Sequence, residues 1–284
     1  MKHSIGQRVF TGILFAFYLT EKPLGRSKYM LRNTTDLIGF TIAATDGEIG
    51  AVKDFYFDDG KWTIRYLVGD TGSWLTGRRV LISPISLGAV DWQAEKLHVN
   101  LSKAQVQNSP DINTLQSISR QHEIALTGYY GYPYYWEGPD VWGGAALPID
   151  LAIEGVPERE TEPANMPSEE EFHLHSTQDV IDYAIEATDG DIGHVDDFVL
   201  DDASWQIRYI AVDTRNWLPG KKVLVAPGWI HQATWRDAKV YVNLSRAAIE
   251  NSPEYDSSKP IGREYETMLY QHYDQPRYWD RKDL

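Results

Sequence analysis

The sequence predicts a mainly β protein made of two small tandem β-barrels, each followed by short helices and joined by a flexible acidic linker. Three observations lead to this fold class. Residues 36–110 and 179–253 align without a gap and are identical at 36 of 75 positions. Both segments break into short runs of β-branched and aromatic residues separated by Gly, Pro and Asn, which is the pattern of short strands and turns. Residues 137–178, which lie between them, carry ten acidic residues and one basic residue, a composition typical of a self-repelling linker.

The repeat has the size of a whole domain. Its constant offset of 143 residues continues to Trp136 in the first half and to Trp279 in the second. A unit of about 100 residues is too long for a solenoid module. We therefore expect an N-terminal extension without packed structure, a first barrel domain, an acidic linker and a second barrel domain, at 1–29, 30–136, 137–178 and 179–284.

Residues 1–29 leave three interpretations open. The apolar run at 9–19 is shorter than the roughly 20 residues that span a bilayer, and no small-x-small cleavage motif follows it. The segment is an extension upstream of a start at Met30, a membrane-touching segment or a signal peptide. The chain has no cysteine, which excludes disulfides and thiolate sites. We expect a cytoplasmic protein, and membrane association is not favoured.

Each unit contains a predicted β-hairpin. The stretch DFYFDDGKWTIRYLVGD begins at Asp54, and two aromatic-rich runs flank its DDGK turn signal. A four-residue loop at 58–61 would place Asp54 opposite Arg65 and the large apolar side chains together on one face. The second unit repeats the pattern, with Asp197 opposite Arg208. We expect both pairs to be cross-strand ion pairs.

Helices and an aromatic tail follow the strands in each unit. Ser102 and Ser245 are placed to cap short helices that end before a proline, and second helices are expected to start near Ser119 and Gly262. Six of the eight residues at 129–136 are aromatic. These tails either close an open end of their own barrel or form a partner-binding patch, because Tyr and Trp are enriched in interface hot spots.

These features together resemble the PRC-barrel family, named from the cytoplasmic domain of the photosynthetic reaction-centre H subunit and shared with a ribosome-maturation factor. The resemblance is carried by LIGFTIAATDGEIGAVKDFYFDD from Leu37, by WTIRYLVGDTGSWLTGRRVLISP from Trp62, and by their second copies from Val180 and Trp205. The first aromatic tail looks like that of stand-alone bacterial members. What the resemblance implies is a six-stranded barrel used as an adaptor or assembly surface, without a shared catalytic motif.

No candidate site in the sequence carries a recognisable chemistry. The TDGEIG segment with Asp46 lacks the ligand spacing of a calcium loop and is expected to be a tight turn. The DD pairs at 58–59 and 201–202 are expected to be solvated turn formers. His173 and His175 have the His-x-His spacing of a weak metal site but lack a further anchor. We therefore assign no catalytic residue, no cofactor-binding residue, no metal ligand and no cofactor.

The function expected from the sequence is that of a non-enzymatic, protein-binding adaptor with an unknown protein partner. The net charge of −14 argues against a nucleic-acid partner, since an acidic surface repels phosphate groups. A homo-oligomer is compatible with the sequence. The alternatives are a membrane-associated role in electron transport like that of the reaction-centre H subunit, and an uncharacterised enzyme or small-ligand binder that uses a cleft between the barrels.

Overall fold

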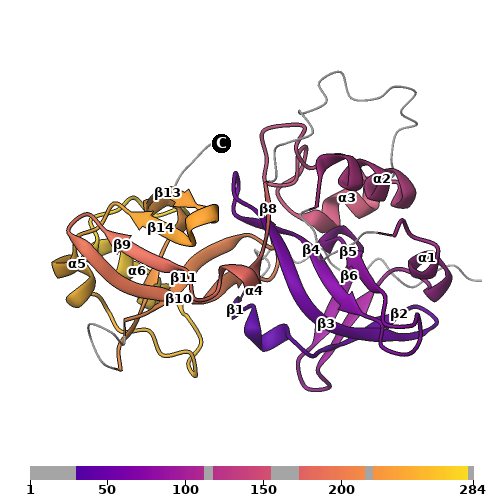
Figure 1. Cartoon of the computed structure of the whole chain (residues 1–284), viewed down its shortest axis with the longest axis horizontal. Coiled ribbons are helices and arrows are strands. Elements are labelled where there is room, and N and C mark those ends of the chain that lie inside the picture. The colour runs from indigo at the N-terminus through magenta and orange to yellow at the C-terminus, as the bar shows by residue number, and fades with distance from the viewer. Residues whose placement is uncertain (1–29, 112–117, 155–172, 215–219, 281–284) are drawn as a thin grey trace, which may run out of the picture.

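The computed structural model of the chain describes residues 30–111, 118–154, 173–214 and 220–280. Its strands form two sheets of seven strands each, so the predicted mainly β class is confirmed. Figure 1 shows two lobes side by side, one built chiefly from the first half of the chain and the other from the second half. Residues 1–29, which we expected to lack packed structure, lie outside the described residues.

The first sheet is an open path of strands in the order β5-β4-β3-β2-β7-β6. Neighbouring strands in it are antiparallel except β2 and β7, which are parallel. No hydrogen-bonded pairing joins β5 to β6 in the described part of the chain, so the predicted barrel is only partly confirmed. The 3₁₀ turn η2 (Pro84–Ser86) connects these two strands, and its proline cannot donate to a ladder. The strands are β2 (Thr41–Ala44), β3 (Gly47–Asp58), β4 (Thr63–Asp70), β5 (Arg79–Ile82), β6 (Leu87–Asp91) and β7 (Lys96–Val99).

The second sheet has the equivalent order, β12-β11-β10-β9-β14-β13. Its 3₁₀ turn η3 (Pro227–Trp229) also begins at a proline, and η4 (Trp235–Asp237) joins its last two strands. The strands are β9 (Ala184–Ala187), β10 (Gly190–Asp201), β11 (Ile207–Asp213), β12 (Lys222–Val225), β13 (Ile230–Thr234) and β14 (Lys239–Val242).

The predicted helix starts are confirmed. Ser102 accepts a hydrogen bond from Gln105 N and forms a capping box, and Ser245 accepts one from Ala248 N. Ser119 and Gly262 are the N-caps of the longer helices. The helices are α1 (Lys103–Gln107), α2 (Arg120–Tyr130), α3 (Pro148–Glu154), α4 (Thr177–Val180), α5 (Arg246–Glu250), α6 (Arg263–His272) and the 3₁₀ turn η1 (Thr35–Leu37).

The two units exchange their first strands. Strand β1 (Leu31–Asn33) pairs with β10 of the second unit, and β8 (Leu174–Ser176) pairs with β3 of the first unit. Figure 1 shows β8 lying beside β3, while β1 lies toward the other lobe. The two exchanges are equivalent, because β1 and β8 occupy corresponding positions of the repeat and meet corresponding strands. The arrangement is a reciprocal strand exchange with pseudo-twofold character.

The larger of two hydrophobic core clusters in the described residues runs through both units. Phe57 of the first unit packs against Phe198 of the second, with ring centroids 5.3 Å apart, and Phe55 lies 6.2 Å from Trp205. Backbone hydrogen bonds also cross between the units, from Ile64 N to Trp205 O and from Ile207 N to Trp62 O. Burial of large apolar side chains is the main favourable contribution to folding, so we expect the two units to stabilise each other.

The expectation of a flexible linker at 137–178 is wrong for its described parts. Trp142 is 1% exposed and Leu151 is 8% exposed, and α3 forms within the segment. The end of the segment supplies β8 and the start of α4. The apolar stretch VWGGAALPIDLA from Val141 explains the packing, because its side chains can bury enough surface to offset the entropy of ordering the chain. Residues 155–172 lie outside the described residues.

Candidate functional site at the junction of the two units

The predicted hairpin forms, but its register differs from the prediction. Asp58 is opposite Thr63, so the four-residue loop lies at 59–62 instead of 58–61. An irregularity in the ladder between Tyr56 and Phe57 shifts the register further and places Asp54 opposite Val68. The predicted Asp54–Arg65 and Asp197–Arg208 ion pairs are therefore wrong. Bulges of this kind leave little trace in a single sequence.

Asp54 and Asp197 hold the exchanged segments in place. Ser176 Oγ donates to Asp54 Oδ2 at 2.5 Å and Thr177 Oγ1 donates to Asp54 Oδ1 at 3.0 Å. In the equivalent position, Thr34 Oγ1 donates to Asp197 Oδ1 at 2.7 Å, and Thr35 donates to the same carboxylate. Burial raises the pKa of both carboxyls despite these hydrogen bonds. The two aspartates belong to the contact between the units.

Arg65 and Arg208 instead pair with the first aspartate of each DD motif. Arg65 Nε donates to Asp58 Oδ2 at 2.6 Å, and Arg208 Nη2 donates to Asp201 Oδ2 at 3.2 Å. Asp58 and Asp201 are 6% and 4% exposed, so the expectation that both members of each DD pair are solvated is wrong. The exchanged strands cover the hairpin ends, and desolvated carboxylates need partners of this kind.

The aromatic tails pack mainly on their own units. Tyr135 is 5% exposed and donates to Glu123 Oε1 at 2.6 Å, while Tyr278 donates to Glu266 Oε1 at 2.9 Å. The arginine that starts each long helix lies beside the same glutamate, since Arg120 Nη1 is 2.9 Å from Glu123 Oε2. Burial raises the pKa of Tyr135 well above its usual value, so this hydroxyl stays protonated and acts as a donor. In the part of the chain that the structure describes, the exposed large apolar side chains are Met30, Tyr129, Ile149 and Met268.

His173 and His175 contact different carboxylates. His173 Nε2 lies 2.9 Å from Glu123 Oε2, whereas His175 Nε2 lies 3.0 Å from Asp59 Oδ2. The His175 ring also stacks on Trp235 of the second unit at 3.8 Å. Burial alone would raise the pKa of Asp59, but the hydrogen bonds from His175 and Trp235 outweigh it and lower that pKa. The His-x-His spacing therefore serves the contact between the units.

The TDG segments form tight turns, as predicted. Ala44 pairs with Gly47 across a two-residue loop, and Asp46 Oδ1 accepts a hydrogen bond from Lys103 N at 2.7 Å. Asp189 accepts one from Arg246 N at the same distance in the second unit. Each aspartate thereby satisfies a free N–H at the start of a short helix.

The two equivalent arginine sites differ in what covers them. In the first unit, the Arg65 guanidinium contacts the rings of both Tyr135 and Trp142, at 3.9 and 4.7 Å from their centroids, and its side chain is 0% exposed. In the second unit, the Arg208 guanidinium lies 4.3 Å from the Tyr278 ring and its side chain is 19% exposed.

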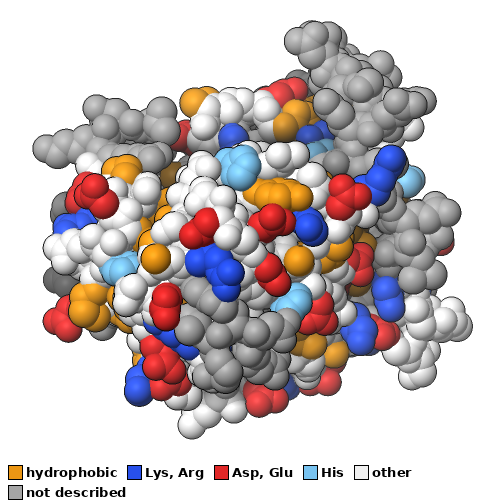
Figure 2. Space-filling model, turned by 60° about the vertical axis from the view of Figure 1, so that its left-hand side comes forward, with side chains coloured by type: hydrophobic (Ala, Val, Ile, Leu, Met, Phe, Trp, Pro, Cys, Tyr) orange, Lys and Arg blue, Asp and Glu red, His pale blue; other side chains and the backbone are white. Residues whose placement is uncertain are grey.

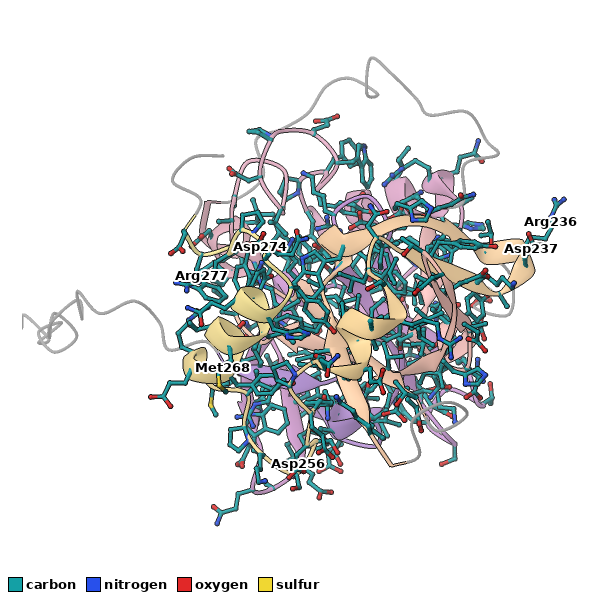
Figure 3. All side chains as sticks on the ribbon, turned by 90° about the vertical axis from the view of Figure 1, so that its left-hand side faces the viewer. Arg236, Asp237, Asp256, Met268, Asp274 and Arg277 are labelled. Atoms are coloured by element: carbon teal, nitrogen blue, oxygen red, sulfur yellow. The ribbon has the colours of Figure 1, made fainter. Side chains whose placement is uncertain are left out.

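A cavity of about 620 Å³ adjoins Arg208 at the junction. The first unit contributes Lys61 and Trp62 to its wall, and the second unit contributes Trp229 and Tyr278. Figure 3 labels Asp274 and Arg277, which flank the wall residues Gln275 and Pro276 in the loop after α6. The volume falls within the range of about 300–1,000 Å³ that is usual for ligand pockets. The residues that line the cavity are Gly60–Trp62, Pro139–Val141, Gln206–Arg208, Ala226–Trp229, Tyr270, Gln275, Pro276 and Tyr278.

The sequence reasoning missed Trp142, Glu123 and the contact role of His173. The signal for Trp142 was present, because residues 141–149 carry no charge within an otherwise acidic segment. The signal for Glu123 was its identity in the repeat, where Glu266 is its equivalent inside an apolar helix face. His173 gave no usable signal, since its partner lies on α2, 50 residues earlier.

The surface of the molecule is mixed in character. Figure 2 shows acidic, basic and apolar side chains interspersed over the face that it presents. In the described ranges, no three or more His, Asp or Glu side chains are grouped so that they could hold a metal ion. None of the helices in the described part of the chain is long and apolar enough to cross a membrane.

Comparison with known proteins identifies one family. No curated protein was found to match the chain. The family match covers β1 to α1, which includes the first hairpin and the Asp58–Arg65 pair. Residues 32–106, which lie in the first unit, match the model of the PRC-barrel domain family.

Proposed function

We propose that this chain is a non-enzymatic adaptor of two PRC-type units, in which the second unit is a further copy of the PRC-barrel domain, and that it assembles with another protein. One observation carries the proposal. The surface made by η2, Arg65 and Tyr135 in the first unit already binds a polypeptide segment, since Trp142 and Leu151 are buried and α3 packs against η2.

The reciprocal strand exchange supports the same proposal. Each unit binds an extended segment of the other unit by adding it to the edge of a long strand, a common mode of protein recognition. The hydroxyl anchors on Asp54 and Asp197 fix the position of the added strands. The fold thus supplies two kinds of polypeptide-binding surface in one chain.

The test uses the full chain as bait in the cells that produce it. Crosslinked proteins that are recovered are purified and mixed with the purified chain, and analytical ultracentrifugation measures the mass of the product. We expect at least one of them to form a complex of fixed stoichiometry. If none of the recovered proteins forms such a complex, the adaptor function is refuted.

A small-ligand binder is a second candidate, and the cavity beside Arg208 is the observation that favours it. A thermal-shift screen of small molecules tests it, because a ligand at 100 times its dissociation constant adds about 2.7 kcal/mol to the free energy of unfolding. The membrane-associated alternative depends on residues 9–19, which lie outside the described residues, and a cytoplasmic location remains an expectation of the sequence.

A further inference from the structure

We propose that the cavity beside Arg208 binds the tryptophan side chain of a peptide segment on the partner protein, in the way that Trp142 occupies the equivalent site of the first unit. This inference rests on the adaptor function proposed above and assigns a place and a chemistry to the contact. The two sites are built from corresponding residues of the repeat, so the filled site shows which ligand the open site fits.

The open site keeps the parts that hold Trp142. Arg208 is equivalent to Arg65 and Tyr278 to Tyr135, and in both units the tyrosine ring covers one face of the guanidinium. In the first unit Trp142 lies over the Arg65 guanidinium as well. Among the described residues, no second ring covers Arg208, and its Nε has no hydrogen-bond partner. An aromatic ring over a partly desolvated guanidinium is a favourable contact.

The acceptor for the indole N–H is also present. Trp142 Nε1 donates to the carbonyl of Ser204 at 2.8 Å. The equivalent residue at the open site is Lys61, which lines the cavity and whose carbonyl accepts from Gln206 Nε2 at 3.2 Å. An entering indole can take the place of this long, flexible amide side chain. The cavity therefore offers both the cationic face and the backbone acceptor that the first unit uses.

The position of the cavity favours a peptide as the occupant. It continues the established contact between the units, since residues from both units and from the connecting segment line it. Gly228 stands where the first unit has Ile85, and a Cβ at Gly228 would have no heavy atom within 4 Å. The space next to Arg208 is thus wider than a single side chain and leaves room for the residues that flank a tryptophan. The segment at 281–284 carries no aromatic residue that could supply the ring.

The probe is a synthetic peptide with the sequence of residues 139–152, PDVWGGAALPIDLA, titrated against the full chain by calorimetry. We expect one peptide to bind per chain, and a peptide with alanine in place of tryptophan to bind at least about tenfold more weakly. The Gly228→Trp variant, which fills the cavity, should lose binding. The Gly262→Trp variant, whose glycine lies outside the cavity and also has no atom near its Cβ position, should bind as the wild type does.

The proposal is overturned if the wild-type chain does not bind the peptide at about 1 mM, or if Gly228→Trp binds it unchanged. It is also overturned if N-acetyltryptophanamide binds as tightly as the peptide, because the site would then recognise a small aromatic molecule. Should Gly228→Trp fail to fold, Arg208→Met takes its place in the titration. Failure of these titrations leaves the crosslinking test of the adaptor function standing, so the two proposals can fail separately.

Discussion

Replacing Arg65 and Arg208 by methionine, one at a time, measures how much each arginine contributes to the free energy of unfolding in its buried or open site. Methionine keeps much of the packing volume and removes the charge. Arg65 is 0% exposed and lies 2.6 Å from Asp58, so its loss leaves a buried carboxylate without its cation. Breaking a buried pair in this way costs about 3–5 kcal/mol.

Arg208→Met should have a smaller effect. The Arg208 side chain is 19% exposed and its distance to Asp201 is 3.2 Å, so water screens this pair and its hydrogen bond is longer than the one that Arg65 makes. Losing one partly screened hydrogen bond to a carboxylate costs about 1–3 kcal/mol. The two variants should therefore differ by about 2 kcal/mol in the free energy of unfolding.

Urea unfolding followed by tryptophan fluorescence gives both free energies. Because the two units share one core, we expect one cooperative transition with the same urea dependence in the wild type and both variants. If Arg208→Met destabilises the chain as much as Arg65→Met, the burial of Arg65 by Trp142 does not strengthen the Asp58–Arg65 pair. The reasoning that links burial of each site to its free energy would then be refuted.

Four further outcomes are expected. Trp142→Ala should cost about 3–5 kcal/mol in the urea assay, because it empties the space of a fully buried ring. Gly50→Ala should cost at least about 2 kcal/mol, since the new Cβ would lie 2.0 Å from a backbone oxygen at φ +144°, whereas Gly144→Ala should be nearly neutral. Burial raises the pKa of Asp54 above its usual 3.8, so the contribution of its protonated form to stability is complete below pH 3.8 and is lost as the pH rises through the pKa of the folded state. The free energy of unfolding of Asp54→Asn minus that of the wild type should therefore increase between pH 3 and neutrality. A difference that does not change with pH would contradict the raised pKa. A chain cut within residues 155–172 should yield two pieces that co-purify in gel filtration, because each piece carries a strand that completes the sheet of the other.

The parts of the fold that could be predicted are those with local signals. The repeat appeared as identity at a fixed offset, and Ser102 and Ser119 appeared as capping residues ahead of helices. The tight turn at Asp46 followed from its Asp-Gly pair. Each of these signals depends on residues within a few positions of one another, so a single sequence is enough to detect them.

The parts that could not be predicted depend on pairing between distant segments. The residues near Leu31 and Leu174 do not indicate that each strand joins the sheet of the other unit. Both units carry an equivalent acceptor strand, so the sequence is equally compatible with pairing inside one unit. The register of the hairpin differs from the prediction because the loop lies one residue later and a bulge between Tyr56 and Phe57 adds a further shift. Arg65 is therefore not opposite Asp54, and its side chain pairs with Asp58. The difference between the Arg65 and Arg208 sites is invisible in the repeat itself, because it comes from Trp142 outside the repeat.

Fusion of the two units in one chain explains how equivalent sites came to differ. Two separate, identical units would present identical arginine sites related by symmetry. In the fused chain the first tail, which ends at Trp136, leads into a segment that returns to the junction and supplies β8 to the first sheet. That segment passes the first site and fills it with Trp142. Among the described residues no ring equivalent to Trp142 covers Arg208, where a cavity lies instead, so one chain combines a self-occupied site with an open one.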